Sequence, residues 1–247
     1  MQSFFDINYA GAPFVLFGSA HLGLMAFAAL VGGLLIRAGR RAGPIKRANL
    51  RKGLGFFFLI NETGTHIWKL NYGIWAVEET LPLQLCGAMA WISGVALLVG
   101  WEKAWPMLYF FGLGGALQGV LTPDAGVYGF PHYQMVETVI VHSALVIGGL
   151  WVVLVEGYRP TFRHLVLILV GLNAAALVMY FVNVGLGSNY LFVNAKPPNA
   201  SIVDLMPEWP WYIPVLEVIA ITLFSLLYLP FASFWRRLVP ARQGLPG

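Results

Sequence analysis

The sequence contains a single cysteine, Cys86, within the stretch LPLQLCGAMAW at residues 81–91. A cysteine thiolate attacks esters, and it needs a base or a positive neighbour in order to form. The histidines that could act as this base are His142 and His66. A cysteine in an apolar helix is equally a small side chain that packs and does not react. Cys86 is therefore either a nucleophile or a packing residue, and its neighbours decide which.

A second group of ionisable residues occurs in the segment INETGTHIWKLNYG, residues 60–73. Glu62, His66 and Lys69 have the spacing i, i+4 and i+7, which places them on one face of a helix. Ionisable side chains inside a membrane are costly and mark candidate sites. We expect this stripe to turn into the bundle and to set the electric field of a cavity.

Other polar residues extend the set of possible partners for the thiol. Those that could orient a histidine are Glu62, Glu137 and Glu217. Those that could stabilise an oxyanion are Gln84, Asn61 and Lys69. At a rise of about 1.5 Å per residue, Cys86, Glu137 and Glu217 are predicted to lie at similar shallow depth below the outer surface. His142 is predicted to lie deeper.

The composition indicates that membrane helices position these residues. Hydrophobic residues make up 58% of the chain and charged residues 11%, with a mean hydropathy of +0.72. A soluble domain carries about a quarter charged residues. The N-terminal segment has no basic region followed by a cleavage-like site, so no signal peptide is expected. The chain is predicted to be one integral membrane domain, residues 1–247.

Seven apolar runs approach the length of roughly 20 residues that a membrane span requires. They are residues 14–36, 53–75, 81–100, 105–121, 133–155, 164–186 and 211–234. The predicted fold is therefore all-α, a polytopic seven-helix bundle. Four glycines in the fourth run predict close helix packing there: Gly112, Gly114, Gly115 and Gly119.

The basic residues predict the orientation of the bundle. Thirteen of the 15 lie in segment 37–52, after the third and fifth runs, or in the C-terminal tail. By the positive-inside rule these parts are cytoplasmic and the N-terminus is outside. Segment 37–52 is then a topology signal in contact with anionic lipid, not a surface for nucleic acid. The long connection before the last run is either an interfacial belt or a lid, on the outer side.

Several short motifs together resemble a known family. They are LPLQLC at 81–86, a glutamate in the second run, a histidine in the fifth, Asn189-Tyr190, Lys196-Pro197, and PEWPWY at 207–212. Spread over most of the chain, they resemble the YwaF-like bacterial membrane proteins and the related transmembrane protein 164 family. The animal branch of that family transfers acyl groups to lysophospholipids through a cysteine nucleophile. The resemblance implies that Cys86 accepts the acyl group and that His142 is its base. Where many relatives have histidine, this chain has Gln84, which leaves the proton transfer to His142.

The sequence therefore predicts a Cys-His phospholipid acyltransferase or transacylase of the bacterial inner membrane, with its site in the outer half. Its substrates would be a phospholipid and a lysophospholipid, and the chemistry requires neither a metal nor an organic cofactor. Two alternatives stay open. One is an ion-coupled transporter that uses the intramembrane Glu, His and Lys side chains; the other is a receptor, although residues 211–235 lack the lysine that retinal would need. The residues expected to line the cavity are Asn61, Glu62, His66, Lys69, Gln84, Glu137, Asn189, Tyr190 and Glu217.

Overall fold

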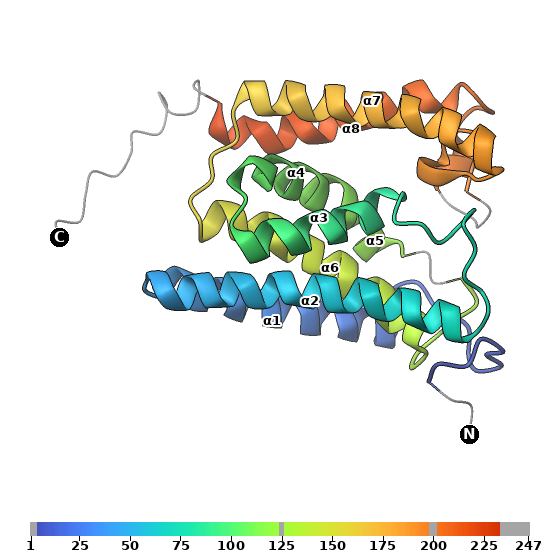
Figure 1. Ribbon diagram of the computed structural model, residues 1–247, viewed down its shortest axis with the longest axis horizontal. Helices are drawn as coiled ribbons and strands as arrows, with labels where there is room; N and C mark the ends of the chain where they lie inside the picture. The colour runs from blue at the N-terminus through green and yellow to red at the C-terminus, as the bar shows by residue number, and fades with distance from the viewer. Residues whose placement is uncertain (1–3, 124–125, 198–201, 233–247) are drawn as a thin grey trace.

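The computed structural model describes residues 4–123, 126–197 and 202–232, and within these ranges the chain is helical with no strand (Figure 1). Six spans are regular helices: α1 (Ser19–Arg41), α2 (Pro44–Asn71), α3 (Leu85–Val99), α6 (Tyr133–Leu154), α7 (Phe162–Leu186) and α8 (Tyr212–Tyr228). The other span is composite, made of η1 (Glu102–Ala104), α4 (Trp105–Phe110), the π-helical turn η2 (Phe111–Gly115) and α5 (Ala116–Leu121). A short turn, η5 (Leu229–Phe231), follows α8. The predicted all-α fold with seven helical spans is confirmed for the described residues.

Five of these spans are long and apolar enough to cross a membrane, namely α1, the composite span, α6, α7 and α8. α2 has 28 residues but carries charged side chains along its length, and α3 is apolar but has only 15 residues. The chain is therefore an integral membrane protein, as its composition predicts.

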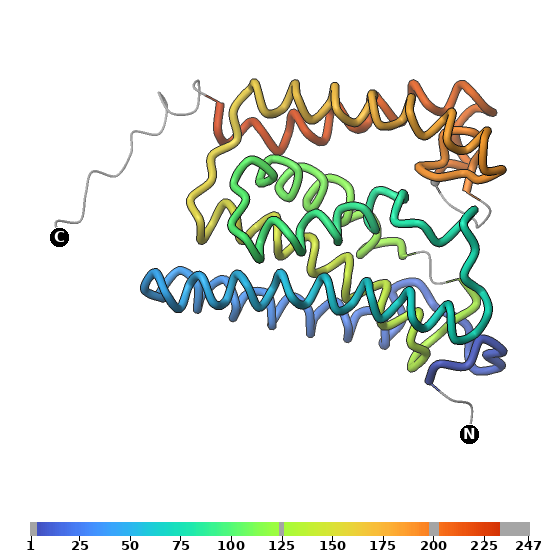
Figure 2. The backbone as a smooth tube through the Cα atoms, in the orientation of Figure 1, coloured from blue at the N-terminus to red at the C-terminus, as the bar shows by residue number. Residues whose placement is uncertain are grey.

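The helices form three tiers, which Figures 1 and 2 show from the same side. α1 and α2 form one tier, α3 to α6 the middle tier, and α7 with α8 the third. α6 is the central helix, since it packs against α1, α2, α3, α4 and α5. Its apolar stretch is 67% buried, whereas those of α7 and α8 are each 11% buried. The core therefore centres on the middle tier, with contributions from α2, α7 and α8.

The connections gather at two opposite ends of the bundle. We call one the basic end, because it holds the α1–α2 turn and the loops after α3 and α6, with their lysines and arginines. The other is the cap end, where the N-terminal segment meets a folded connection that we call the cap, residues 187–197 and 202–211. The cap contains η3 (Tyr190–Phe192) and η4 (Ile202–Leu205). That the basic end is cytoplasmic stays a prediction.

The basic segment 37–52 is not the loop that the sequence suggests. Only Ala42 and Gly43 lie outside the flanking helices, so α1 runs five residues beyond its predicted end at 36 and α2 begins nine residues before 53. Arginine and lysine are good helix formers, and Pro44 suits the first turn of α2. Hydropathy marks where a helix can lie in hydrocarbon, but it does not mark where the helix ends.

Glycines let the central helices approach closely. A Cβ built on Gly112 would lie 2.5 Å from the carbonyl oxygen of Leu145 in α6, which confirms the predicted packing of the fourth span. Between α2 and α3, a Cβ on Gly55 would lie 2.7 Å from the backbone nitrogen of Leu98. These contacts hold η2 against α6 and α3 against α2.

Candidate active site

Cys86 lies in the first turn of α3, at the cap end. α3 begins here because Gln84, the residue before it, has an extended backbone with φ −68° and ψ 144°. The thiol is partly buried and packs against the apolar core. It forms no hydrogen bond with another described residue, so it is available for reaction while its side chain also fills space.

Backbone donors without acceptors surround the thiol. The first hydrogen bond into α3 runs from the N–H of Ala88 to the carbonyl of Gln84, at 2.9 Å. The N–H groups of Leu85, Cys86 and Gly87 therefore have no acceptor among the described residues, as is usual at a helix N-terminus. This end of a helix also carries a partial positive charge. Backbone N–H groups are among the donors from which oxyanion holes are built. They were missed at the sequence level because only side chains were considered.

His142 is held in one tautomer. Its Nδ1 lies 2.7 Å from the carbonyl oxygen of Thr138, one turn earlier in α6, so Nδ1–H donates this bond. In the neutral ring Nε2 is then unprotonated, and it has no hydrogen-bond partner among the described residues. A free Nε2 is what a general base needs. No hydrogen bond joins His142 to Cys86 in the described residues.

Leu85, the residue before Cys86, and His142 contact one segment of the composite span. A Cβ on Gly115, the last residue of η2, would lie 3.5 Å from the side chain of Leu85, and a Cβ on Gly119 of α5 would lie 2.2 Å from the ring of His142. Gly115 and Gly119 are four residues apart, about one helical turn. The glycine at 119 makes room for the imidazole.

Glu62 is the ionisable group of α2 that the fold buries. It is 9% exposed and forms no hydrogen bond with another described residue. Its carboxyl lies close enough to Cys86 to act on the thiol electrostatically, and Glu137 and Lys69 act on Glu62 in the same way. His66 and Lys69 are half-buried. Of the three residues of the predicted stripe, Glu62 is therefore the most completely buried, and it is the one that acts on Cys86.

Two other predicted site residues of this region are engaged with neighbours. Asn61 Nδ2 donates to Glu137 Oε1 at 2.8 Å, which ties α2 to α6. His66 Nδ1 accepts a hydrogen bond from the indole N–H of Trp75 at 3.0 Å. Asn61 therefore orients Glu137, and His66 is turned toward the loop after α2 and not toward the thiol.

The cap is bonded to the chain that leads into Cys86. The hydroxyl of Tyr190 donates to the carbonyl of Val77 at 2.6 Å and accepts from the N–H of Leu81 at 2.9 Å. Gln84 Oε1 accepts from the N–H of Leu191 at 3.0 Å. Gln84 and Tyr190 therefore fix the entry to α3, and the side-chain oxygen of Gln84 is already in use.

Asn189, the remaining predicted residue of the cap, bonds within the cap. Its Oδ1 accepts from the N–H groups of Asn194 and Ala195, and its Nδ2 donates to the carbonyl of Ala195. Asn183 of α7 holds the backbone of Tyr190 through both its amide atoms. Substrate binding by Asn189 stays a prediction, whereas its contribution to the shape of the cap is observed.

A comparison with known families covers all of these elements. The family model of the TMEM164 family matches residues 16–228. The chain belongs to the TMEM164 family. No curated protein and no solved structure matches it. The matched range includes α1 through α8 and both Cys86 and His142.

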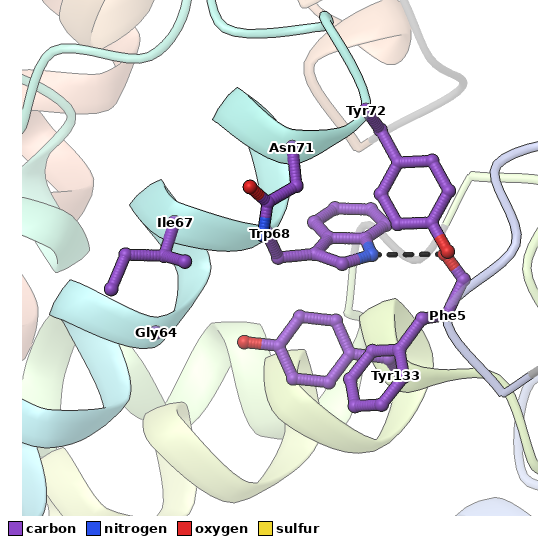
Figure 3. A pocket seen from close by; sticks show the side chains of 7 residues that line it. All are labelled: Phe5, Gly64, Ile67, Trp68, Asn71, Tyr72 and Tyr133. Atoms are coloured by element: carbon purple, nitrogen blue, oxygen red, sulfur yellow. Dashed lines mark hydrogen bonds between the residues drawn. The ribbon is translucent and has the colours of Figure 1, made fainter.

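A groove lies at the cap end of this TMEM164 family member, on the side of α2 that faces the N-terminal segment (Figure 3). It has a volume of about 590 Å³. Its lining residues are Phe5, Gly64, Ile67, Trp68, Asn71, Tyr72 and Tyr133. The indole N–H of Trp68 donates to the carbonyl of Phe5 at 2.9 Å, the dashed line in Figure 3. The groove is aromatic and uncharged, and neither Cys86 nor His142 lines it.

Glu217 lies apart from the other predicted site residues. Its Oε1 accepts from Nδ2 of Asn173 at 2.9 Å, between α8 and α7. Asn173 is near the middle of α7, so Glu217 lies level with the middle of that helix. The predicted shallow depth of Glu217 below the outer surface stays a prediction. In the part of this TMEM164 family protein that is described, no three His, Cys, Asp or Glu side chains gather to hold a metal ion.

Proposed function

We propose that the protein moves a fatty acyl group from a phospholipid to a lysophospholipid through a thioester on Cys86. The observation that carries this proposal is the lone thiol in the first turn of α3, beside backbone N–H groups that have no acceptor. Membership of the TMEM164 family supports a membrane protein of this architecture. A bacterial inner membrane, with the cap end outside, would place Cys86 near the depth of the phospholipid ester bonds.

The reaction has two balanced halves. His142 Nε2 takes the proton of the Cys86 thiol, and the thiolate attacks the carbonyl carbon of the donor ester. The N–H groups of Cys86 and Gly87 bind the resulting oxyanion. Collapse breaks the ester C–O bond, and His142 returns its proton to the departing lysophospholipid oxygen. The hydroxyl of the acceptor lysophospholipid then attacks the thioester, with His142 as base, and the thiol leaves protonated.

Surrounding groups support this assignment. Catalytic hydrogen bonds are often long before substrate binds. Leu85 and His142 contact the composite span about one turn apart, and the proposal requires the imidazole to close on the thiol when substrate binds. The aromatic groove on α2 provides an apolar surface of the kind that an acyl chain contacts.

The test is acyl transfer by the purified protein in vesicles that contain a phospholipid and a labelled lysophospholipid. We expect Cys86→Ala to lower the rate by at least about 10³-fold, and a trapped thioester on residue 86 to be released by hydroxylamine. Cys86→Ser keeps the size of the side chain but not its reactivity at neutral pH, and is expected to be equally inactive. Both variants should retain the thermal unfolding midpoint, because the thiol makes no hydrogen bond. An active Cys86→Ala protein would overturn the proposal.

The competing function, ion-coupled transport, is favoured by Glu62 alone, a buried carboxyl without a hydrogen-bond partner. Transport of this kind requires Glu62 and not the thiol. Uptake into vesicles that persists after thiol alkylation and is lost in Glu62→Gln would support the transporter and contradict the acyltransferase.

A further inference from the structure

α7 presents a face that the rest of the described chain does not cover. Its apolar stretch is 11% buried, and the uncovered positions run along the whole helix. Val166, Val170, Asn173 and Leu177 are all exposed, and the intervals between them are four, three and four residues. This is the a/d spacing of helices that pack lengthwise against one another, and asparagine at one such position fixes register and partner number.

The polar member of this face is incompletely bonded. Asn173 uses both N–H groups of its amide, one to the carbonyl of Leu169 at 3.0 Å and one to Glu217 Oε1 at 2.9 Å. Its Oδ1 and the second carboxyl oxygen of Glu217 have no partner among the described residues. The pair lies near the middle of α7, where hydrocarbon offers no hydrogen bonds and polar groups are costly. Lipid tails on this face would leave both oxygens unsatisfied.

We propose that α7 is the contact surface between two copies of this chain that lie side by side in the membrane. Across this surface the Asn173 amide and the Glu217 carboxyl of one copy face those of the second copy. Such an interface is self-complementary, so one pair of residues supplies both halves. It encloses both polar side chains between protein surfaces, away from the lipid tails. The proposal is independent of acyl transfer, because Cys86 and His142 belong to other tiers.

Disulfide formation in native membranes tests this contact. In a Cys86→Ser background, Leu177→Cys places one thiol on the proposed interface, and Leu30→Cys on α1 is the matched control. The two leucines are 62% and 63% exposed, so random collision would link both equally. We expect oxidation to give a covalent dimer with Leu177→Cys and at most a trace with Leu30→Cys. Equal linking, or none at position 177, would overturn the proposal.

A second measurement uses the unmodified chain, whose mass in lipid nanodiscs should be that of a dimer. Asn173→Leu should weaken association by about threefold or more, the range of interhelical hydrogen bonds in membranes. Glu217→Gln preserves the hydrogen-bonding atoms and should keep the dimer. The inference would be contradicted if the unmodified chain were monomeric, or if Asn173→Leu left the association of the dimer unchanged.

Discussion

Polar residues are placed differently on the two sides of this bundle. On the α2–α3–α6 side, ionisable and amide groups concentrate toward the cap end and are enclosed by close helix contacts. On the α7–α8 side, one amide and one carboxyl lie at mid-span on a face that is otherwise apolar. Enclosed polar groups can be held in one tautomer and one orientation, as His142 is. A polar pair on an open face selects a neighbour instead. Burial therefore distinguishes the site proposed for chemistry from the surface proposed for association.

Exchanging a glycine for alanine on each side would test this contrast most severely. Gly119→Ala would place a Cβ 2.2 Å from the ring of His142, whereas no atom lies within 4 Å of a Cβ on Gly171 in α7. We expect Gly119→Ala to destabilise the fold by about 1–3 kcal/mol through overpacking. Because the imidazole must move, acyl transfer should fall about 10²-fold. Gly171→Ala should be neutral or stabilising by up to about 1 kcal/mol.

Thermal unfolding in detergent and the vesicle assay measure both consequences of the glycine exchange. If the two alanine variants behaved alike, α5 would not position His142 and the contrast between the two sides would fail.

A smaller effect is expected from removing one hydroxyl of the cap. Tyr190→Phe deletes two hydrogen bonds, to Val77 and from Leu81, and should cost about 1–3 kcal/mol because the tyrosine that makes them is 1% exposed. Tyr180→Phe in α7 is the matched control, since its hydroxyl has no partner among the described residues. Hydrogen exchange at residues 77–86 should rise in Tyr190→Phe alone. Unchanged exchange in that variant would show that the cap does not fix the entry to α3.

The smallest effect concerns pH at the cap end. His132 is 1% exposed, accepts the N–H of Gln134 with Nδ1, and donates from Nε2 to the carbonyl of Asp6. Burial lowers the pKa of His132, against the opposing effect of its contacts with Asp6. The stabilisation by the neutral ring is complete above the ordinary pKa of about 6.5 and is lost as the pH falls through the lowered value.

Proteolysis of the N-terminal segment should therefore increase on acidification. His132→Asn keeps an acceptor at the helix N-cap but does not titrate, so its proteolysis should not vary with pH in this range. A pH dependence that survived in this variant would assign the effect to another group.

The sequence predicted the parts of this architecture that depend on single segments. The runs 133–155 and 164–186 correspond to α6 and α7 within two residues at each end. The burial of Glu62 followed from its spacing and from the cost of charge in hydrocarbon. The family resemblance, carried by short motifs such as LPLQLC, agrees with the match to the TMEM164 family.

What could not be predicted depends on how segments are placed relative to one another. The hydrogen bond between Glu217 and Asn173 depends on how α8 packs against α7, which no pattern within α8 records. The engagement of Gln84 by Leu191 depends on the fold of the cap, more than 100 residues later in the chain. The free N–H groups beside Cys86 belong to every helix start. They become informative only when the structure locates the start of α3 at Leu85 and shows that no preceding carbonyl accepts a hydrogen bond from them.

The two-residue turn between α1 and α2 constrains how the chain enters the membrane during synthesis. α1 is apolar enough to insert by itself, whereas α2 does not reach that level on its own. Ala42 and Gly43 form a connection too short for one helix to stay at the membrane surface while the other crosses. We therefore expect the pair to insert as a helical hairpin, in which the apolar α1 stabilises the more polar α2 in the membrane. A substitution that makes α1 more polar should therefore impair the insertion of α2, and Glu62 would then be absent from the bundle.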